Sequence, residues 1–599
     1  MYKFRAARRV VEASLVVSAI GTVLTALPAG ATAAYVVNSS ADQHDLTPNG
    51  ICATAAGVCT LRAALDEANA SAPGSGPIYI SVTPASVQLS LTPIGEDANA
   101  GGDLDITTQN PVNIRGTGTS FSTLTALSGD RVLDVIGAQV TLTNVYLTGG
   151  TAVGGGGLEV KSKGSVTGAR LFVGNNVAGV GGGISLDNSS ITLTEGSTVF
   201  SNSNYNPPGQ SGGFGGGIVA LNSSVRMSNS NIQGNVAGAG FAGGGGIFAL
   251  GSALDIRSSL ILNNQVSVAS SSWGNFGGGG IALGFTSNLV AASTGSSLTM
   301  VSSSVESNDG GRGPGGGILA ITNSGFPMTK AVISRSVFEW NRGAGGGALA
   351  INRSYASVSQ SSMSANMSLL YPAGFGANVG GSGGAVLNTE GRLELGTSTL
   401  EYNSSALGGG AISTLTPNGL ASTAVASSTI AENTASAAGG GLEMAGKGQL
   451  DVGSSTITRN VASTTAANLV SDIGSVTVAN SIVGEPRSVS GLTIASCYSA
   501  AGIQSGGYNL MTDATCKLTA LSDRIAPTTG VGPLANNTGP LAGTGSYAKV
   551  PDTMLPVAGG PAVDQIPSLT LSPDERGVSR PVGPKADIGS VERRLVAPY

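Results

Sequence analysis

Residues 337–349 read VFEWNRGAGGGAL, and this stretch joins two phrases that recur along most of the chain. The first phrase is an apolar residue, two variable residues and an asparagine, and the second is a glycine cluster followed by a small apolar residue. A repeat of this length indicates a solenoid, in which stacked units share one core. The clusters end at Gly157, Gly183, Gly217, Gly246, Gly280, Gly317, Gly347, Gly384, Gly410 and Gly441. The asparagines are Asn175, Asn202, Asn235, Asn264, Asn308, Asn341, Asn366, Asn403, Asn433 and Asn460.

The spacing of the two phrases separates framework from loops. Cluster and asparagine are 18 or 19 residues apart in seven of the ten units, whereas the step from asparagine to the next cluster varies from 6 to 18 residues. A constant segment that alternates with a variable one is typical of a framework with loops. We therefore expect all the loops to leave one edge of the stack.

The framework has the pattern of short strands. In one unit, Ile281 and Leu283 follow the glycine cluster, Leu298 and Met300 lie ten and eight residues before the asparagine, and Val305 lies three before it. Alternation with a period of two marks half-buried strands. The chain is thus predicted to be all-β, a parallel β-helix with three short strands per coil. The asparagines are interpreted as turn residues, which tolerate left-handed backbone and can stack into an amide ladder.

The two ends of the chain differ from the repeats. Residues 1–33 have a basic start, a 13-residue apolar run and the small-residue sequence ATA at residues 31–33, which together predict a signal peptide. A retained membrane anchor is the alternative. No later apolar stretch reaches 18 residues, so no membrane span is expected after the signal is removed. The remaining divisions are a cap with irregular coils at 34–150, repeats at 151–485, and final coils with a cap at 486–599.

Four cysteines form two local pairs on either side of the repeats, Cys52 with Cys59 and Cys497 with Cys516. In a secreted chain such pairs predict two disulfides, and metal binding is the alternative. Residues 60–69, TLRAALDEAN, predict a short amphipathic helix that begins after Thr60. Because the open end of a solenoid must be covered, we expect this helix to cap the first coil.

Three groups of residues resemble known bacterial proteins. Residues 59–64, CTLRAA, followed by EAN at 67–69, resemble the CSLREA motif near the start of surface β-helix proteins, and GDLDI at 102–106 is similar to a segment that those proteins carry. Residues 506–592 resemble the choice-of-anchor Q region, through GGYNL at 506–510, DERG at 574–577 and DIG at 587–589. The repeats resemble the FxxN and GGAI repeats of polymorphic outer-membrane proteins. These resemblances imply a right-handed parallel β-helix on or outside a bacterial cell, and they supply no catalytic residues.

Two details qualify the resemblance. Ala63 stands where the CSLREA motif has glutamate, which removes the carboxylate of a capping box and predicts a weaker helix start. Only seven residues follow Glu592, with no barrel or anchor sequence, so we expect a secreted or non-covalently held protein.

Acidic residues offer three places for chemistry. Glu306 and Glu339 occupy equivalent positions in consecutive units, and they are interpreted either as a calcium site or proton-transfer pair, or as an exposed pair relieved by Arg312 and Arg342. A second group forms either a calcium site or a capping hydrogen-bond network, and its members are Glu96, Asp97, Asp103 and Asp105. A third group is expected to form ion pairs that tie the tail to the last coil, and its members are Asp574, Arg576, Arg580, Asp587 and Glu592.

A catalytic set cannot be assembled from these residues. The single histidine, His44, precludes a Ser/His/Asp or Cys/His arrangement, so no catalytic residue is assigned. No cofactor is expected, with calcium as the only alternative. The chain has no basic run and a net charge of −5, which argues against binding of nucleic acid.

Aromatic side chains in the variable loops are the candidate ligand-binding residues. They come from three consecutive loops on the same edge, and we expect them either to stack on sugars or anchor a protein, or to fold inward and pack their own loops. The candidates are Tyr205, Phe214, Phe241, Trp273 and Phe276, and a later loop adds Tyr371 and Phe375.

The sequence therefore favours a secreted or cell-surface, non-enzymatic bacterial β-helix. We expect a monomer that binds an extracellular glycan or protein partner through its loop edge. A polysaccharide lyase or glycoside hydrolase on the same scaffold is the second hypothesis, and a purely structural rod is the third.

Overall fold

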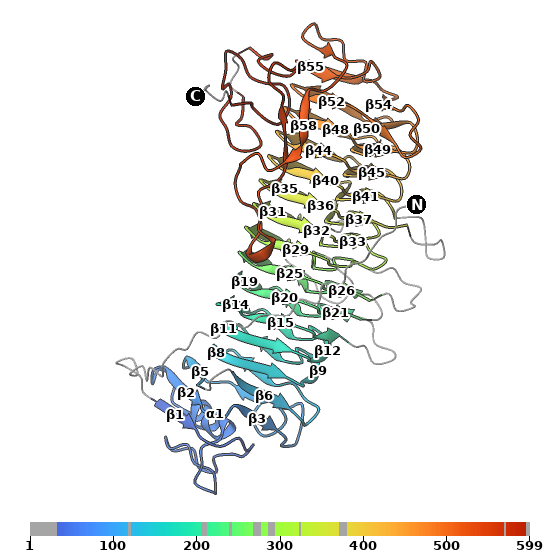
Figure 1. Cartoon of the computed structure of the whole chain (residues 1–599). Helices are drawn as coiled ribbons and strands as arrows, with labels where there is room; N and C mark the ends of the chain where they lie inside the picture. Colours follow the sequence, from blue (N-terminus) through green and yellow to red (C-terminus); the bar gives the residue numbers. More distant parts are fainter. Residues whose placement is uncertain are drawn as a thin grey trace.

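Strands of successive repeats pair in parallel and in register, and they stack the chain into a right-handed parallel β-helix (Figure 1). The computed structural model describes residues 33–117, 121–204, 213–238, 242–267, 277–284, 294–322, 325–370, 380–567 and 571–594. The predicted fold class is confirmed. The predicted signal peptide lies outside the described residues except for Ala33, the first residue of β1 (Ala33–Val37).

The three predicted strand columns are present. The ten strands that follow the glycine clusters belong to a fourteen-stranded sheet, which two further strands extend at each end. Its strands are β4 (Leu104–Ile106), β7 (Leu133–Ile136), β10 (Leu158–Lys161), β13 (Ile184–Asp187), β18 (Ile218–Leu221), β23 (Ile247–Leu250), β27 (Ile281–Leu283), β30 (Ile318–Ile321), β34 (Leu349–Asn352), β38 (Val386–Thr389), β42 (Ile412–Thr416), β46 (Leu442–Gly446), β50 (Ala466–Ser471) and β54 (Ala495–Ser499).

The other two columns belong to a larger sheet. One contains β24 (Ala253–Arg257), β28 (Ser297–Val301), β31 (Lys330–Ser334), β35 (Tyr355–Ser359), β39 (Arg392–Gly396), β43 (Ser422–Ala426), β47 (Gln449–Gly453) and β51 (Ser475–Ala479). The other contains β25 (Leu260–Leu262), β29 (Ser304–Glu306), β32 (Val337–Glu339), β36 (Ser362–Ser364), β40 (Thr399–Glu401), β44 (Thr429–Ala431), β48 (Thr456–Thr458) and β52 (Ile482–Gly484). A fourth column of two-residue strands follows the asparagines, for example β26 (Gln265–Val266) and β33 (Arg342–Gly343).

The inward-facing residues of all columns meet in one continuous core. It is built from aliphatic side chains such as Ile281, Met300 and Val305, each buried completely. The glycine clusters allow neighbouring coils to approach closely, because a Cβ on Gly317 would lie 2.6 Å from the carbonyl oxygen of Ala348 in the next coil.

The predicted asparagine ladder is present, but its first member and the position of its left-handed residue differ from the prediction. Each side-chain NH₂ donates to the amide oxygen of the next asparagine, for example from Asn264 to Asn308 at 3.0 Å. The first member is Asn176, which donates to Asn202, and the predicted Asn175 instead donates to the Tyr146 hydroxyl. The left-handed residue is the one before each ladder asparagine, because Asn175 has φ 58° and the ladder asparagines have negative φ. Each ladder amide also accepts a backbone N–H, which satisfies the turn.

A second ladder of serines was missed in the sequence. The serine five residues before each asparagine from Asn235 to Asn460 is buried, and the hydroxyls from Ser259 onward accept the backbone N–H of the equivalent serine in the preceding coil, as Ser361 Oγ does from Ser336 at 3.1 Å. The fixed distance to the asparagine is the signal that identifies it. The column contains Ser230, Ser259, Ser303, Ser336, Ser361, Ser398, Ser428, Ser455 and Ser481. Ser481 extends this column, although no asparagine follows it five residues later.

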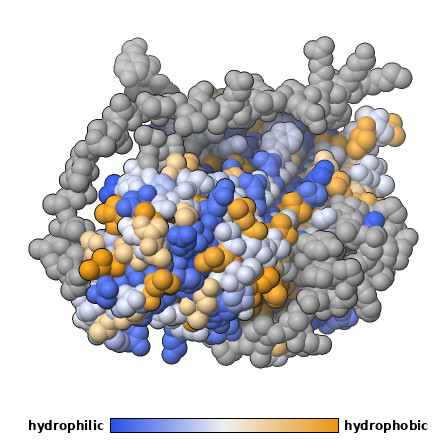
Figure 2. Space-filling view, turned by 90° about the horizontal axis from the view of Figure 1, so that it is seen from below, coloured by the Kyte–Doolittle hydropathy of each residue, from blue (hydrophilic) through white to orange (hydrophobic). Residues whose placement is uncertain are grey.

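The predicted helix caps the first coils. Helix α1 (Leu61–Ala70) begins after Thr60, whose hydroxyl oxygen accepts the Ala63 N–H at 3.1 Å. Its apolar face is fully buried, and both predicted disulfides, Cys52–Cys59 and Cys497–Cys516, are formed. Seen from this end, the surface is a mosaic of hydrophilic and hydrophobic residues rather than one apolar area (Figure 2).

The C-terminal residues turn back along the flank of the stack. Residues 531–592, called the strap here, include β58 (Val531–Ala535), a 3₁₀ turn (Gly545–Tyr547) and β59 (Thr553–Pro556), and they lie against the outer faces of β29 to β52 (Figure 1). The strap reaches Ser304, whose hydroxyl oxygen accepts the Thr544 N–H at 3.2 Å.

The acidic and basic residues of the tail were expected to tie it to the last coil, and they bond mainly to one another. Arg576 pairs with Asp574 at 2.7 Å, and Arg580 donates to the carbonyl oxygens of Asp587 and Gly589. Contact with the coils is made by other groups, including Glu575, which accepts the Thr399 hydroxyl at 2.8 Å.

No helix in the part of the chain that the structure describes is long and apolar enough to cross a membrane.

Candidate functional site

Of the predicted aromatic residues in the loops, the structure describes Phe214. Phe214 is 5% exposed, and its ring centroid lies 4.5 Å from that of Phe248, in a small apolar cluster with Val219. The inward-packing alternative therefore describes Phe214. The other candidates, Tyr205, Phe241, Trp273 and Phe276, lie outside the described residues, as do Tyr371 and Phe375.

Two other aromatic side chains stand at the corner from which the loops leave. Trp340 is 66% exposed and Tyr402 is 56% exposed. Each immediately precedes a ladder asparagine, Asn341 or Asn403. Ala365 occupies the same position in the coil between them, so the two rings project from one column without a bulky neighbour between. The sequence prediction considered only aromatic residues in the variable loops, and it missed these two because they belong to the framework.

The backbone at these two positions disfavours large side chains. Trp340 has φ 57° and Tyr402 has φ 54°, in the left-handed region that glycine and asparagine tolerate best. Most other members of the column are small or polar: Asn175, Ser201, Gly234, Asn263, Ser307 and Ala365.

Two further members of this column, Glu432 and Arg459, have partners. Glu432 forms an ion pair with Arg487 two coils further on, and Arg459 forms one with Glu485 in the next coil. Trp340 and Tyr402 are thus large side chains held in an unfavourable backbone conformation and left largely exposed, so neither propensity nor core packing accounts for them.

A cavity of about 340 Å³ lies next to Trp340. Arg342 donates to Asp309 Oδ2 from Nε at 2.9 Å and from Nη2 at 2.7 Å, which fixes one wall. The cavity combines an indole side chain with amide, hydroxyl, carboxylate and guanidinium groups. Its lining residues are Asn263, Asn264, Gln265, Ser307, Asp309, Trp340 and Arg342. We call Trp340, Tyr402 and these lining residues the aromatic corner.

A second cavity of about 460 Å³ lies on another flank, and its lining includes Arg353, Glu390 and Arg392. Beside it, the Tyr355 hydroxyl donates to Glu394 at 2.7 Å. The hydrogen bond from Arg353 lowers the pKa of Glu390, and the hydrogen bond from Tyr355 lowers the pKa of Glu394. Both carboxylates are therefore ionised at neutral pH, so neither can donate a proton, and the lowered pKa also makes each a weak base.

The predicted pair of Glu306 and Glu339 is adjacent, but it is not exposed. The two residues pair in register across β29 and β32, which confirms the prediction that they lie side by side in consecutive coils. The cation beside them is Lys549 of the strap, which bonds to Glu339, whereas Arg342 bonds to Asp309. Glu306 is 3% exposed, and burial raises its pKa to about 8. Because the strap covers this pair, it does not face an open groove.

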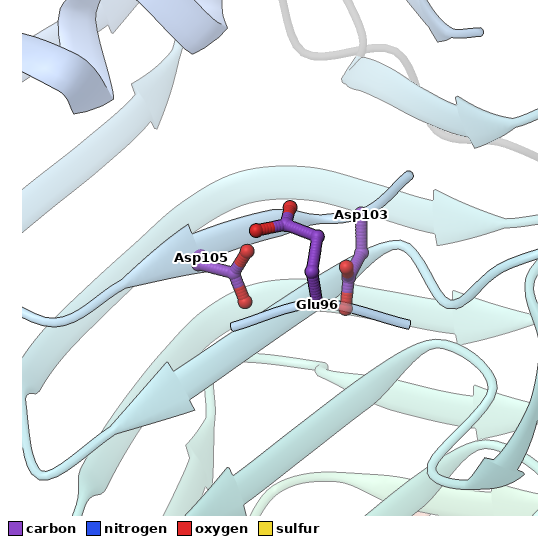
Figure 3. A group of neighbouring side chains, drawn as sticks. All are labelled: Glu96, Asp103 and Asp105. Carbon is purple, nitrogen blue, oxygen red and sulfur yellow. The ribbon is translucent and has the colours of Figure 1, made fainter. Parts of the chain in front are cut away.

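Acidic residues at the N-terminal cap lie close enough to share a metal ion. Among the described residues these groups are Glu96 with Asp103 and Asp105, and Asp97 with Asp105 and Asp134. Figure 3 shows the first group, in which the carboxylates of Glu96 and Asp105 face one another. Burial raises the pKa of Asp103 to about 8 and that of Asp105 to about 7. The predicted hydrogen-bond network is also present, because Asp105 accepts the Asn99 N–H at 2.7 Å.

Comparison with known proteins gives a likeness of structure and none of sequence family. No family model matches the chain, and no curated protein matches it. Among solved structures, the crystal structure of pectate lyase Pel9A is similar, with 11% sequence identity and a TM-score of 0.23 over 94% of this chain and 98% of that chain. At this TM-score the likeness carries no argument about activity, and the fold assignment rests on the strand pairing itself.

Proposed function

We propose that this protein is a secreted or cell-surface bacterial β-helix that binds an extended glycan along the aromatic corner. The observation that carries the proposal is the presence of Trp340 and Tyr402, large and exposed, at left-handed positions where the column otherwise carries small or polar residues. An unfavourable conformation that packing does not explain is typical of a functional position.

The arrangement of the corner suits a saccharide chain. Trp340 and Tyr402 are two coils apart, which corresponds to about 10 Å along the stack. Flat aromatic faces stack on the apolar faces of pyranose rings, while the groups around the cavity offer donors and acceptors for hydroxyls. The ladder holds both positions rigidly, so little conformational entropy remains to be lost on binding.

A folded protein partner is less well supported. A stable protein interface buries about 800 Å² on each side with an apolar centre. The cavity beside Trp340 has a polar lining and offers no such apolar centre.

The extracellular location is supported by the two disulfides, which persist in oxidising compartments. The predicted signal peptide and the resemblance to bacterial surface proteins agree with it. How the protein is attached to the cell is no part of the proposal.

A polysaccharide lyase or hydrolase is the alternative function. The second cavity offers ionised carboxylates and arginines, but its glutamates lack the raised pKa of a general acid. Glu306 and Glu401, whose pKa values burial raises, lie beneath the strap, and Glu575 lies within the strap itself. Binding without cleavage is therefore the favoured outcome.

The test is a glycan array followed by titration calorimetry with the oligosaccharides that bind. Replacing both Trp340 and Tyr402 with alanine should weaken binding about tenfold or more, because each aromatic stack contributes about 1 kcal/mol. Tyr498→Ala, an exposed tyrosine 46% accessible on β54, is the matched control and should bind as the wild type does. Full binding by the double variant would contradict the proposal, and release of shorter sugars by the wild type would favour the enzyme.

A further inference from the structure

The loop between β3 (Ser86–Leu89) and β4, together with β4 itself, brings three carboxylates together. Glu96 lies in this loop, Asp103 directly precedes β4, and Asp105 lies within β4. One carboxylate oxygen from each residue lies within 4.8 Å of the others. Glu96 and Asp105 point toward one another, with Asp103 beside them (Figure 3).

Two of these carboxylates have a buried oxygen that no described donor reaches. Asp103 is 2% exposed and Asp105 is fully buried, and neither Oδ1 atom accepts a hydrogen bond. Burial of a carboxylate oxygen without a partner is costly, and such atoms in folded proteins usually mark a bound ion or water.

The neighbouring cations leave this group negatively charged. Arg131 pairs with Asp103 at 3.0 Å, while Lys161 pairs with Asp134 at 2.8 Å and with Asp97 at 3.0 Å. Within the described ranges, neither cation forms an ion pair with Glu96 or Asp105. The cluster therefore holds more acidic groups than its two basic neighbours neutralise.

We propose that Glu96, Asp103 and Asp105 bind a calcium ion. All three ligands supply hard carboxylate oxygens, which favours calcium over the softer transition metals. The nearby His44 is engaged elsewhere, since its two ring nitrogens bond to Asp66 and to the carbonyl oxygen of Ala100. Affinities of extracellular calcium modules are about 10⁻⁴–10⁻³ M, which matches a site of three carboxylates.

The ion stabilises the attachment of the cap. Arg62 of α1 donates to the carbonyl oxygens of Asp103 at 2.8 Å and Gly102 at 2.9 Å, and Asn99 donates to Asp66 of the same helix at 2.7 Å. The acidic loop is thus the joint between α1 and the first coil. Neutralising its carboxylates strengthens that joint, independently of any glycan bound at the aromatic corner.

The experiment uses the full secreted chain after treatment with EDTA. Calorimetric titration with calcium chloride should show saturable binding, and the Tm should rise by several degrees in millimolar calcium but not in sodium chloride of equal ionic strength. Asp105→Asn should raise the Tm without calcium, because it removes a buried charge, and should abolish the calcium response. Glu96→Gln, at a half-exposed position that tolerates substitution, should weaken calcium binding at least tenfold.

Asp187→Asn, at an exposed aspartate on β13, is the matched control and should keep the full calcium response. Absence of calcium binding by the wild type would overturn the proposal. So would an unchanged response in Glu96→Gln, which decides the matter if Asp105→Asn does not fold. An equal Tm rise with magnesium would show an effect of divalent charge rather than a calcium site.

Discussion

Adjacent residues at the asparagine corner have opposite roles. The ladder asparagine is buried and bonds to the coils on both sides, whereas the residue before it takes the left-handed conformation and faces solvent. The first position therefore contributes to stability, and the second is free to vary. Trp340 and Tyr402 show what that freedom permits, because an exposed position on a rigid turn can carry a large side chain that does not contribute to the core.

Removing one ladder amide should destabilise the stack. In Asn264→Ala, the backbone N–H of Asn235 loses its acceptor at 3.1 Å, and the Asn308 amide loses its donor at 3.0 Å. A buried donor without a partner costs about 1–3 kcal/mol, so the Tm should fall and hydrogen exchange at Asn235 should accelerate. Gln265→Ala, at the exposed neighbouring position, should change neither, and equal exchange rates in the two variants would contradict the role of the ladder.

Trp340 is expected to lower the Tm of the protein while it contributes to glycan affinity. Trp340→Gly removes the Cβ from a left-handed residue, and the relief of about 1 kcal/mol should raise the Tm or leave it unchanged. The same variant should lose glycan affinity. Trp340→Ala, which keeps the Cβ and its strain, is the control and should lose affinity without the gain in Tm. A marked fall in Tm for the glycine variant would show that the indole packs against its neighbours.

At the scale of elements, the strap changes the chemistry of the strands that it covers. Lys549 bonds to Glu339 and lies 3.6 Å from Glu401, and both strands of the glutamate pair lie beneath the strap. Burial keeps Glu306 and Glu401 from ionising easily, with pKa values raised to about 8 and about 7. A column that reads as an exposed acidic face in sequence is therefore a covered, partly protonated one.

This burial predicts a pH dependence. The pKa of Glu306 rises from 4.5 to about 8 on folding, so the folded protein binds the proton more tightly between these values. Its contribution to stability is complete below pH of about 4.5 and is lost as the pH rises through about 8, by about 1.4 kcal/mol per unit at most. Glu306→Gln should therefore raise the Tm at pH 8 and have little effect at pH 5, relative to the wild type.

The charged groups that face Glu306 are Glu339, Lys549 and the Tyr547 hydroxyl, and all remain in the variant. Glu195→Gln, at an exposed turn, is the control and should leave the pH profile unchanged. An equal Tm gain at both pH values would mean that Glu306 is ionised in the folded protein.

At the scale of the whole molecule, the stack is closed at one end by α1 and supported along one flank by the strap (Figure 1). The strap forms a small second core with the outside of the coils, in which Met554, Ile566 and Ile588 pack against Ala431, Ile482 and Leu510. A solenoid has no closed surface of its own, so covering elements decide which faces meet solvent.

Ending the chain after Gly530 should expose these apolar residues together with the buried acidic column. We expect a lower Tm and self-association, measured by thermal unfolding and by size-exclusion chromatography with light scattering, whereas the full chain should be monomeric. Ending it after Arg594 removes only residues 595–599 and should change nothing. A monomeric strap deletion with the wild-type Tm would show that the strap is an independent appendage.

The sequence alone determined the fold because each coil repeats the same short pattern of apolar residues, glycines and an asparagine. Period-two apolar residues specify the strands, glycines allow close approach, and asparagines at a nearly fixed distance after the glycine clusters specify the corner. The capping helix and both disulfides were predictable for the same reason, since their partners lie close together in the chain. The serine ladder was readable from its fixed spacing, although it was missed.

Only the tertiary structure decided what the repeat leaves open. Whether Asn175 or Asn176 joins the ladder depends on the register of one turn, and the burial of Glu306 depends on a strap that begins more than two hundred residues later. Exposure of Trp340 and Tyr402 likewise depends on which faces the strap leaves uncovered. A local pattern specifies backbone and core, whereas accessibility and charge state follow from contacts between distant segments, which no repeat encodes.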